Sequence, residues 1–140
     1  MHLLCAANRV PLSYDELTPA NVAEVYLTEE LLAEARLLGD GLARKLFGDL
    51  AYRSGDLKEA LIECDILLVT ERSGTRPGVR QHVEIALASL KRVFGLGETL
   101  ATTLTGLATR IAAKIAAYTY AFLVNRLLGR PQGRIKELWA

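Results

Sequence analysis

The chain has 140 residues, of which 51% are hydrophobic, 24% charged and 6% aromatic, so we expect one domain with a sizeable core. This composition excludes a disordered chain, a collagen and a multidomain enzyme. The net charge of +1 hides an uneven distribution, because residues 1–70 hold six basic and twelve acidic residues and residues 71–140 hold eleven and four. The basic second half predicts either contact with a polyanion or a solvated helical surface.

Cysteine usage and the apolar segments favour a soluble cytoplasmic protein. Cys5 and Cys64 lie far apart in apolar surroundings, without the paired spacing of a zinc site or a disulfide framework. Residues 1–8 lack the basic start and the long apolar run of a signal peptide. Three basic residues interrupt the apolar stretch over 99–128, so we expect no membrane span there.

The first half of the chain alternates strand and helix signals. Its start reads as a hairpin, because two apolar runs flank Asn8 and Arg9 and Asn tolerates turn geometry. Helical spacing and a stop at Gly39 predict a helix next, with an interruption near Thr28 left open. The expected elements are strands 2–6 and 10–14, helix 21–38, strand 44–48, helix 55–63 capped by Ser54, and strand 66–70. This order predicts an α/β (α+β) fold with one mixed sheet and helices packed on it.

The second half is helical almost throughout. After a polar loop, apolar residues recur with helical spacing over 79–94, stop at two glycines and recur over 100–128. Gly129 and Pro131 end the second helix, in which a bend at Gly106 is left open. The aromatic residues expected in the core or between helices are Tyr118, Tyr120, Phe122 and Trp139. We see no linker or repeat between the two halves.

Three charged residues fall on one line of the helix predicted over 79–94. Arg80, Glu84 and Lys91 lie near 0°, 40° and 20° around its axis at ~100° per residue. Apolar residues occupy the adjoining arc, so this polar line is expected to border the core. It is either a functional site or an ordinary i,i+4 surface ion pair, worth only ~0.3–0.5 kcal/mol. His82, about 200° around the axis, is expected on the surface.

Asp49 follows the apolar run LFG, so its carboxylate is expected at the C-terminal end of a strand, where active-site groups of mixed sheets gather. A turn-capping Asp is the alternative. If Asp49 and Glu84 converge to ~4 Å, they repel by about 4 kcal/mol at an effective dielectric constant of about 20. A proton, Arg80 or Lys91 alongside, or a divalent cation can neutralise this repulsion, and such oxygen ligands suit Mg²⁺ or Mn²⁺.

Two segments around these residues resemble the second and third motif regions of insertion-sequence DDE transposases, whose catalytic domain has an RNase H-like fold. They are GDLAYRS over 48–54 and RQHVEIALASLKRVFGL over 80–96. HLLCAANRVPLSYDELTPANVAEV is similar to the strand pair and helix entry after the family's first motif, and GLATRIAAKIAAYTYAFLVNRLLGRP to its helical tail. Arg80, Glu84 and Lys91 reproduce the family spacing of Arg, three residues, Glu, six residues and Lys. The family's Tyr before that Arg is Pro77 here.

The resemblance implies DNA transposition by two-metal phosphoryl transfer, in which carboxylates hold Mg²⁺ or Mn²⁺ ions that activate a water or a terminal 3′-hydroxyl. Asp49 and Glu84 would be the second and third catalytic, metal-binding acids. Arg80 and Lys91 would position the phosphates of the transposon ends. The implied partners are this DNA and either further copies of the chain or a full-length transposase, with no membrane.

The family's first catalytic Asp lies on a strand that precedes the segment with which this chain begins. Asp15 and Asp40 are the nearest acids, and neither is expected to replace it, because metal ligands must converge at bonding distance. We therefore expect a single partial RNase H-like domain over 1–140, with a sheet-forming part over 1–70 and the catalytic helix and helical tail over 79–128. Alone, it is expected to be catalytically inactive.

A second class of function stays open, a non-enzymatic DNA-binding or interaction protein derived from a transposase, which would restrain the full-length enzyme. The basic second half motivates it, since phosphate contacts need such side chains. The candidates are Arg72, Arg76, Arg92, Arg110, Lys114, Arg126, Arg130, Arg134 and Lys136. A decayed reading frame without a selected function is the third possibility.

Overall fold

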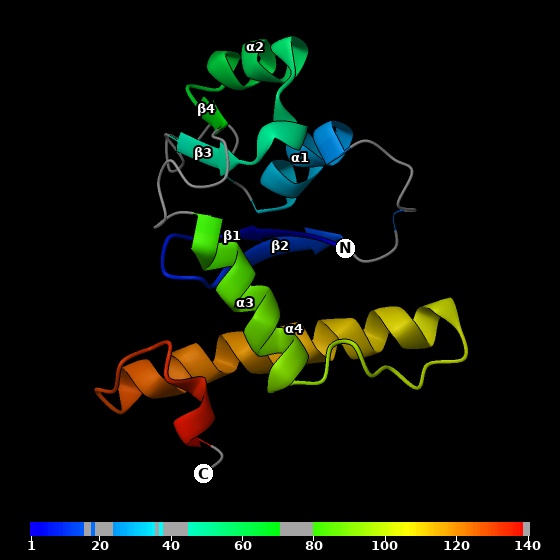
Figure 1. Ribbon diagram of the computed structural model, residues 1–140, viewed down its shortest axis with the longest axis vertical. Coiled ribbons are helices and arrows are strands. Elements are labelled where there is room, and N and C mark those ends of the chain that lie inside the picture. The colour runs from blue at the N-terminus through cyan, green and yellow to red at the C-terminus, as the bar shows by residue number, and fades with distance from the viewer. Residues whose placement is uncertain (16–17, 19–23, 36, 38–44, 71–79, 139–140) are drawn as a thin grey trace.

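The computed structural model describes residues 1–15, 18, 24–35, 37, 45–70 and 80–138, and the structural statements below concern these residues. Its elements, in chain order, are β1 His2–Cys5, β2 Pro11–Asp15, α1 Glu24–Glu34, β3 Lys45–Gly48, the 3₁₀ turn η1 Leu50–Tyr52, α2 Gly55–Glu63, β4 Leu67–Thr70, α3 Arg80–Arg92, α4 Leu104–Leu127 and the 3₁₀ turn η2 Ile135–Leu138. Figure 1 shows β3, β4, α1 and α2 at one end, the β1–β2 hairpin in the middle, and α3 and α4 at the other end. The α+β class predicted from the sequence is confirmed.

The N-terminal hairpin forms where the sequence predicts it. β1 and β2 pair antiparallel, and the turn between them holds Arg9 at a positive φ of 74°. Because successive side chains of a strand point to opposite faces, Leu4 packs on one side of the hairpin and Leu3 and Cys5 on the other. The hairpin therefore contributes side chains to both hydrophobic clusters of the molecule, which are described below.

β3 and β4 form a parallel pair that starts with Lys45 opposite Leu67. Parallel neighbours need a crossover connection, and η1 and α2 supply it. The Ser54 Oγ accepts a hydrogen bond from the backbone N–H of Leu57 at 3.4 Å and caps α2 at the predicted position. The predicted bounds 55–63 are confirmed.

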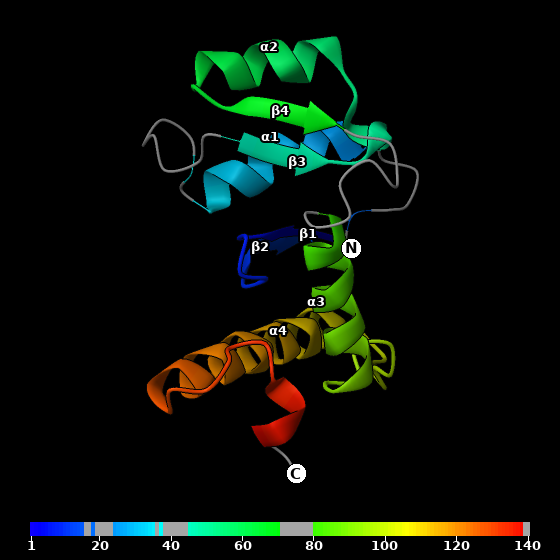
Figure 2. The same cartoon turned by 60° about the vertical axis from the view of Figure 1, so that its left-hand side comes forward.

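The four strands do not form the single mixed sheet that the sequence predicts. Among the described residues, β1 pairs with β2 and β3 with β4, and no strand ladder joins the two pairs. Figure 2 shows the hairpin and the β3–β4 pair one above the other, with α1 beside β3. A ladder needs neighbouring strands about 4.8 Å apart, and no described strand lies between β1 and β3 to continue it.

A small hydrophobic cluster, here the upper cluster, holds the first part of the chain together. Its buried residues come from α1, α2 and the start of β4: Leu32, Leu57, Leu61 and Ile66. Leu4 of β1 and Leu46 of β3 pack against it, so side chains link the two strand pairs where the backbone does not. α1 is also tied to β2, because the buried Ser13 Oγ donates a hydrogen bond to the Leu31 carbonyl oxygen at 2.6 Å.

A larger cluster, here the lower cluster, lies between α3, α4, η2 and the hairpin. Its buried residues are Ala86, Leu90, Ile111, Ile115, Tyr118, Ala121, Phe122 and Ile135. Tyr118 lies at its centre, edge-on to Phe94 with ring centroids 5.9 Å apart and tilted against Phe122 at 5.0 Å. The Tyr118 hydroxyl donates a hydrogen bond to the Arg9 carbonyl oxygen at 3.3 Å, which ties α4 to the hairpin turn.

One open question about the helices is answered and two predictions need correction. α1 runs without interruption through Thr28, whose side chain is buried. α4 starts at Leu104 instead of residue 100, because the Thr103 Oγ1 accepts from the Gly106 N–H at 3.1 Å and caps the helix there. Tyr120 is 65% exposed and does not pack in the core. Trp139 and the ends of the helix predicted over 21–38 lie outside the described residues.

One described helix bears on the expectation that the second half holds no membrane span. Among the described helices, α4 with its 24 residues is long and apolar enough to cross a membrane. Its alanines and leucines offset the basic side chains that we expected to exclude it. Only 28% of its most apolar stretch is buried, so much of the helix surface stays open.

Candidate active site

Asp49 directly follows β3, as the sequence predicts, and also acts as a turn cap. Its Oδ1 accepts a hydrogen bond from the backbone N–H of Ala51 at 2.8 Å, at the start of η1. The residue is partly buried. A Cβ at Gly48 would lie 3.0 Å from the Tyr52 ring, so a larger residue at this position would have to push the ring aside. The capping role that we considered as the alternative is therefore present.

Glu84 lies on α3, but on the side of the helix that faces solvent. The two fully buried residues of α3, Ala86 and Leu90, come two and six residues later, about 160° and 120° around the axis from Glu84. Glu84 and Lys91 are exposed. The expectation that this polar line borders the core is wrong, because α3 buries an arc rotated away from the predicted one.

The polar line of α3 is too long to act at one point. Arg80 begins α3, and its side chain lies outside the described part of the chain. Lys91 follows eleven residues later, about 16 Å along the axis at 1.5 Å per residue. Arg80 and Glu84 are separated by about 6 Å on the same scale, so they share one end of α3 and Lys91 lies near the other.

Asp49 and the start of α3 lie on the same side of the molecule. β3 and β4 run parallel and end at one edge, and in Figures 1 and 2 the first turn of α3 points toward that edge. The C-terminal end of β3, which Asp49 follows, and the first turn of α3 thus lie on the same side of the molecule. Within residues 1–15, 24–35, 45–70 and 80–138, no three His, Cys, Asp or Glu side chains gather as metal ligands. A complete metal centre is not present among them.

His82 is the residue of α3 that sequence reasoning placed wrongly. It is partly buried, and its Nδ1 is shielded from solvent without a hydrogen-bond partner among the described residues. Its position follows from the same rotation of α3, since Ala86 comes four residues after His82 and faces the core. If the buried arc of this helix had been centred on Ala86 instead of Leu87, the sequence would have predicted His82 on its buried side.

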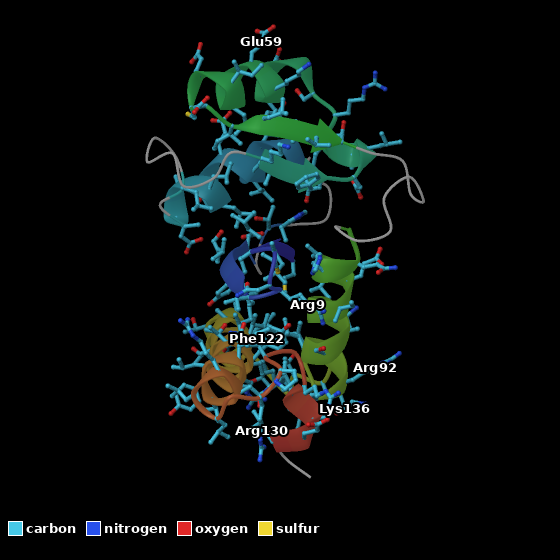
Figure 3. The ribbon with its side chains drawn as sticks, turned by 90° about the vertical axis from the view of Figure 1, so that its left-hand side faces the viewer. Arg9, Glu59, Arg92, Phe122, Arg130 and Lys136 are labelled. Carbon is cyan, nitrogen blue, oxygen red and sulfur yellow. The ribbon has the colours of Figure 1, made fainter. Side chains whose placement is uncertain are left out.

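Several basic residues lie in or against the helical part, and Arg9 of the hairpin turn was not expected among them from the sequence. Figure 3 labels Arg9, Arg92, Arg130 and Lys136 there, with Glu59 at the opposite end. Arg9 joins them because its guanidinium lies over Gly133, where a Cβ would be 3.2 Å from an Arg9 nitrogen. Arg134 is exposed and lies 3.4 Å from Glu137. We call Arg9, Arg92, Arg130, Arg134 and Lys136 the basic end.

The hydrophobic surroundings of the hairpin suppress ionisation of two nearby groups. Burial raises the pKa of the Cys5 thiol to about 11. Burial also raises the pKa of Tyr118 to about 12, with a further increase from Cys5 and an opposing decrease from Arg9. A thiol held protonated is a poor nucleophile, so Cys5 has a packing role here. Both cysteines are free, as predicted.

Comparison with known proteins gives no relative: no family model, no curated protein and no solved structure matches the chain. Its function therefore has to be argued from its own residues.

Proposed function

We propose that the chain serves DNA transposition as the C-terminal part of a DDE transposase catalytic domain. Asp49 and Glu84 are its second and third acids, and Arg80 and Lys91 contact phosphates. We place it in the cytoplasm, in keeping with its free cysteines.

The observation that carries this proposal is the position of Asp49 relative to α3. A carboxylate that leaves a parallel strand at its C-terminal end is in the usual place for catalysis in a mixed sheet. The helix that bears Glu84 starts on the same side. The succession of hairpin, helix, strand, helix and strand also agrees with the resemblance, and the break between β1 and β3 lies where its first strand would run.

The described residues do not by themselves fit a metal centre, because they supply two carboxylates where the family uses three. We therefore derive no step through a bound ion. The side chains act by position: Arg80 donates in a forked geometry to one phosphate, and Lys91, about 10 Å beyond Glu84, acts as a point charge on another. The completing acid comes from a strand between β1 and β3, and without it the chain does not cleave DNA.

Paramagnetic Mn²⁺ tests whether Asp49 and Glu84 converge. At millimolar Mn²⁺, a weak ion held by both should broaden the amide NMR signals around both residues. Asp49→Asn keeps a capping oxygen for Ala51 and removes the charge, so broadening should fall at both sites together. Glu84→Gln should do the same. Glu59→Gln, on exposed α2, is the control and should leave both signals as they were.

Broadening at only one of the two residues would remove the chemical basis of the proposal. A cleavage assay with Mg²⁺ adds a second test. DNA cleavage by the chain alone, lost in Asp49→Ala, would show that no further acid is needed and that the chain is not incomplete.

The basic end favours a second candidate, a non-enzymatic DNA-binding protein. Its five side chains come from the hairpin turn, α3 and the segment after α4, so residues far apart in sequence supply basic groups to the same half of the molecule. Contacts to phosphates release counterions and make binding weaken steeply with salt. Arg130→Gln with Lys136→Gln should weaken binding to DNA of any sequence, whereas Lys58→Gln on exposed α2 should not. Equal binding by both variants would exclude this surface.

A further inference from the structure

One face of α4 is exposed, uncharged and largely apolar along most of the helix. Six positions define it, and we call them the α4 stripe: Thr109, Ala113, Ala116, Tyr120, Leu123 and Leu127. All six are exposed, and Tyr120, Leu123 and Leu127 keep 65%, 46% and 77% of their surface open. The opposite face of α4 packs in the lower cluster against α3, the hairpin and η2. Figure 3 shows this arrangement with α4 viewed nearly along its axis.

The spacing of the α4 stripe is that of a helix-pairing seam. Its positions follow one another at steps of four, three, four, three and four residues. Apolar residues at alternating steps of three and four are the pattern by which two helices pack knobs into holes. A core helix needs such a pattern on its buried side only, whereas α4 carries apolar residues on both sides.

We propose that the α4 stripe binds the α4 stripe of a second copy of this chain, with the two helices antiparallel. Small residues occupy the N-terminal half of the stripe and large ones the C-terminal half. An antiparallel pair places Leu123 of each copy opposite Ala113 of the other. The other matched positions are Leu127 with Thr109 and Tyr120 with Ala116. Each large side chain then meets a small one along the whole seam.

A parallel pair would pack poorly. It would place alanine opposite alanine in the N-terminal half and leave voids there, while Tyr120, Leu123 and Leu127 would meet their own copies at the other end. Helix interfaces reach the density of protein interiors, and both voids and overcrowding cost stability. The two-fold antiparallel arrangement is also the one in which a single surface complements itself.

Charge and area set the expected strength of this pair. The basic residues of α4 border the stripe instead of lying within it, and the Lys114 Nζ is engaged by the Gly95 carbonyl oxygen of its own copy. The stripe is about 27 Å long and one helix, about 10 Å, wide. This footprint is smaller than the ~800 Å² per partner of a standard interface, so we expect a weak dimer that forms only at high protein concentration.

The partner is a protein helix and not a lipid surface, because the middle of the stripe is alanine. Interfacial helices insert Trp, Phe and Leu, and alanine has little apolar surface to bury in lipid. The same small side chains let two helix backbones approach closely. The dimer does not depend on a role in transposition.

Sedimentation of the full chain tests the proposal. We expect a monomer–dimer equilibrium, and Ala116→Lys should raise its dissociation constant at least tenfold. Ala33→Lys is the matched control, since Ala33 is an exposed alanine on α1, and it should leave the constant unchanged. Circular dichroism verifies that both variants stay folded. A chain that is monomeric at about 1 mM, or two variants with equal constants, would overturn the proposal.

Disulfide cross-linking tests the orientation. A mixture of Ala113→Cys and Leu123→Cys chains should form a cross-linked pair, in excess of the background from Cys5 and Cys64 in the unsubstituted chain. Ala113→Cys alone should not, because antiparallel helices hold its two copies about 15 Å apart. Cross-linking of Ala113→Cys alone would overturn the antiparallel arrangement.

Vesicles containing anionic phospholipid test the competing occupant. The unsubstituted chain should stay in solution with them. If it co-sediments with the vesicles and Ala116→Lys weakens this co-sedimentation, the stripe is a lipid surface and the proposal is wrong.

Discussion

The upper and lower clusters are built differently. The lower cluster has eight buried residues, supplied mainly by two helices, which form their backbone hydrogen bonds within themselves. The upper cluster has four, under two strand pairs that no ladder connects. A two-stranded sheet is only marginally stable by itself, so the upper part depends on α1 and α2 to hold it. We infer that the stability of the chain is concentrated in its helical part.

The largest expected effect is the loss of the Tyr118 ring. Tyr118 is 1% exposed and contacts both Phe94 and Phe122, so Tyr118→Ala should lower the free energy of unfolding by about 3–5 kcal/mol. Urea denaturation followed by circular dichroism measures it. Tyr26→Ala, at a ring that is 78% exposed, is the control and should change stability by less than about 0.5 kcal/mol. Equal losses would mean that the lower cluster does not carry the stability.

A truncation in the upper cluster should cost somewhat less and act locally. Leu61 is 1% exposed, and Leu61→Ala should remove about 3 kcal/mol from the upper part. Hydrogen exchange should then speed up in α2 and β4 and stay slow in α4, because regions can open separately. Ile62→Ala, at an exposed neighbour, is the control. Faster exchange in α4 as well would show that the two clusters unfold as one.

The two helix caps should differ by a smaller amount. Thr103→Ala removes a 3.1 Å cap from α4 and should cost about 1 kcal/mol. Ser54→Ala removes a longer bond of 3.4 Å from α2 and should cost about 0.5 kcal/mol. Thermal unfolding of both variants checks this order. If Ser54→Ala lost more stability than Thr103→Ala, the order would be contradicted, and the α4 cap in the helical part would be the weaker of the two.

The smallest expected effect is a loss of stability at alkaline pH, which does not appear at neutral pH. Burial raises the pKa of Cys5 from 9.0 to about 11 and that of Tyr118 from 10.0 to about 12. Both groups are neutral when protonated, so the unfolded chain ionises first, and stability falls as the pH rises from about 9 to about 12. In Cys5→Ala the fall should begin nearer pH 10. Urea titrations at each pH measure the stability of both chains. If stability began to fall at the same pH in Cys5→Ala as in the unsubstituted chain, this prediction would be contradicted.

Local patterns were enough to predict most elements. The hairpin around Asn8 and Arg9, the Ser54 cap and the glycine after α4 each depend on neighbouring residues, and all three are confirmed. The division of the sheet was not predictable, because pairing depends on residues far apart in sequence. Tyr120 was misplaced for a related reason: on a helix with apolar residues on both sides, periodicity does not tell which side is buried.

The candidate site was predictable only in part. The run before Asp49 correctly placed this residue at the end of a strand. The orientation of Glu84 was wrong, since a helix with apolar residues over a broad arc can rotate by tens of degrees and still bury some of them. Arg9 gave no signal at all: its place in the basic end comes from contact with Gly133, at the other end of the chain.

The hydrogen bond from Tyr118 to Arg9 spans 109 positions and has a consequence for biosynthesis. The hairpin leaves the ribosome before α4 and η2, which cover its Leu3 and Cys5 face. At 5–20 residues per second, that face stays uncovered for roughly ten seconds in the nascent chain. A ribosome stalled before residue 118 would therefore present an apolar hairpin to chaperones, because the packing of this face is completed only by helices translated later.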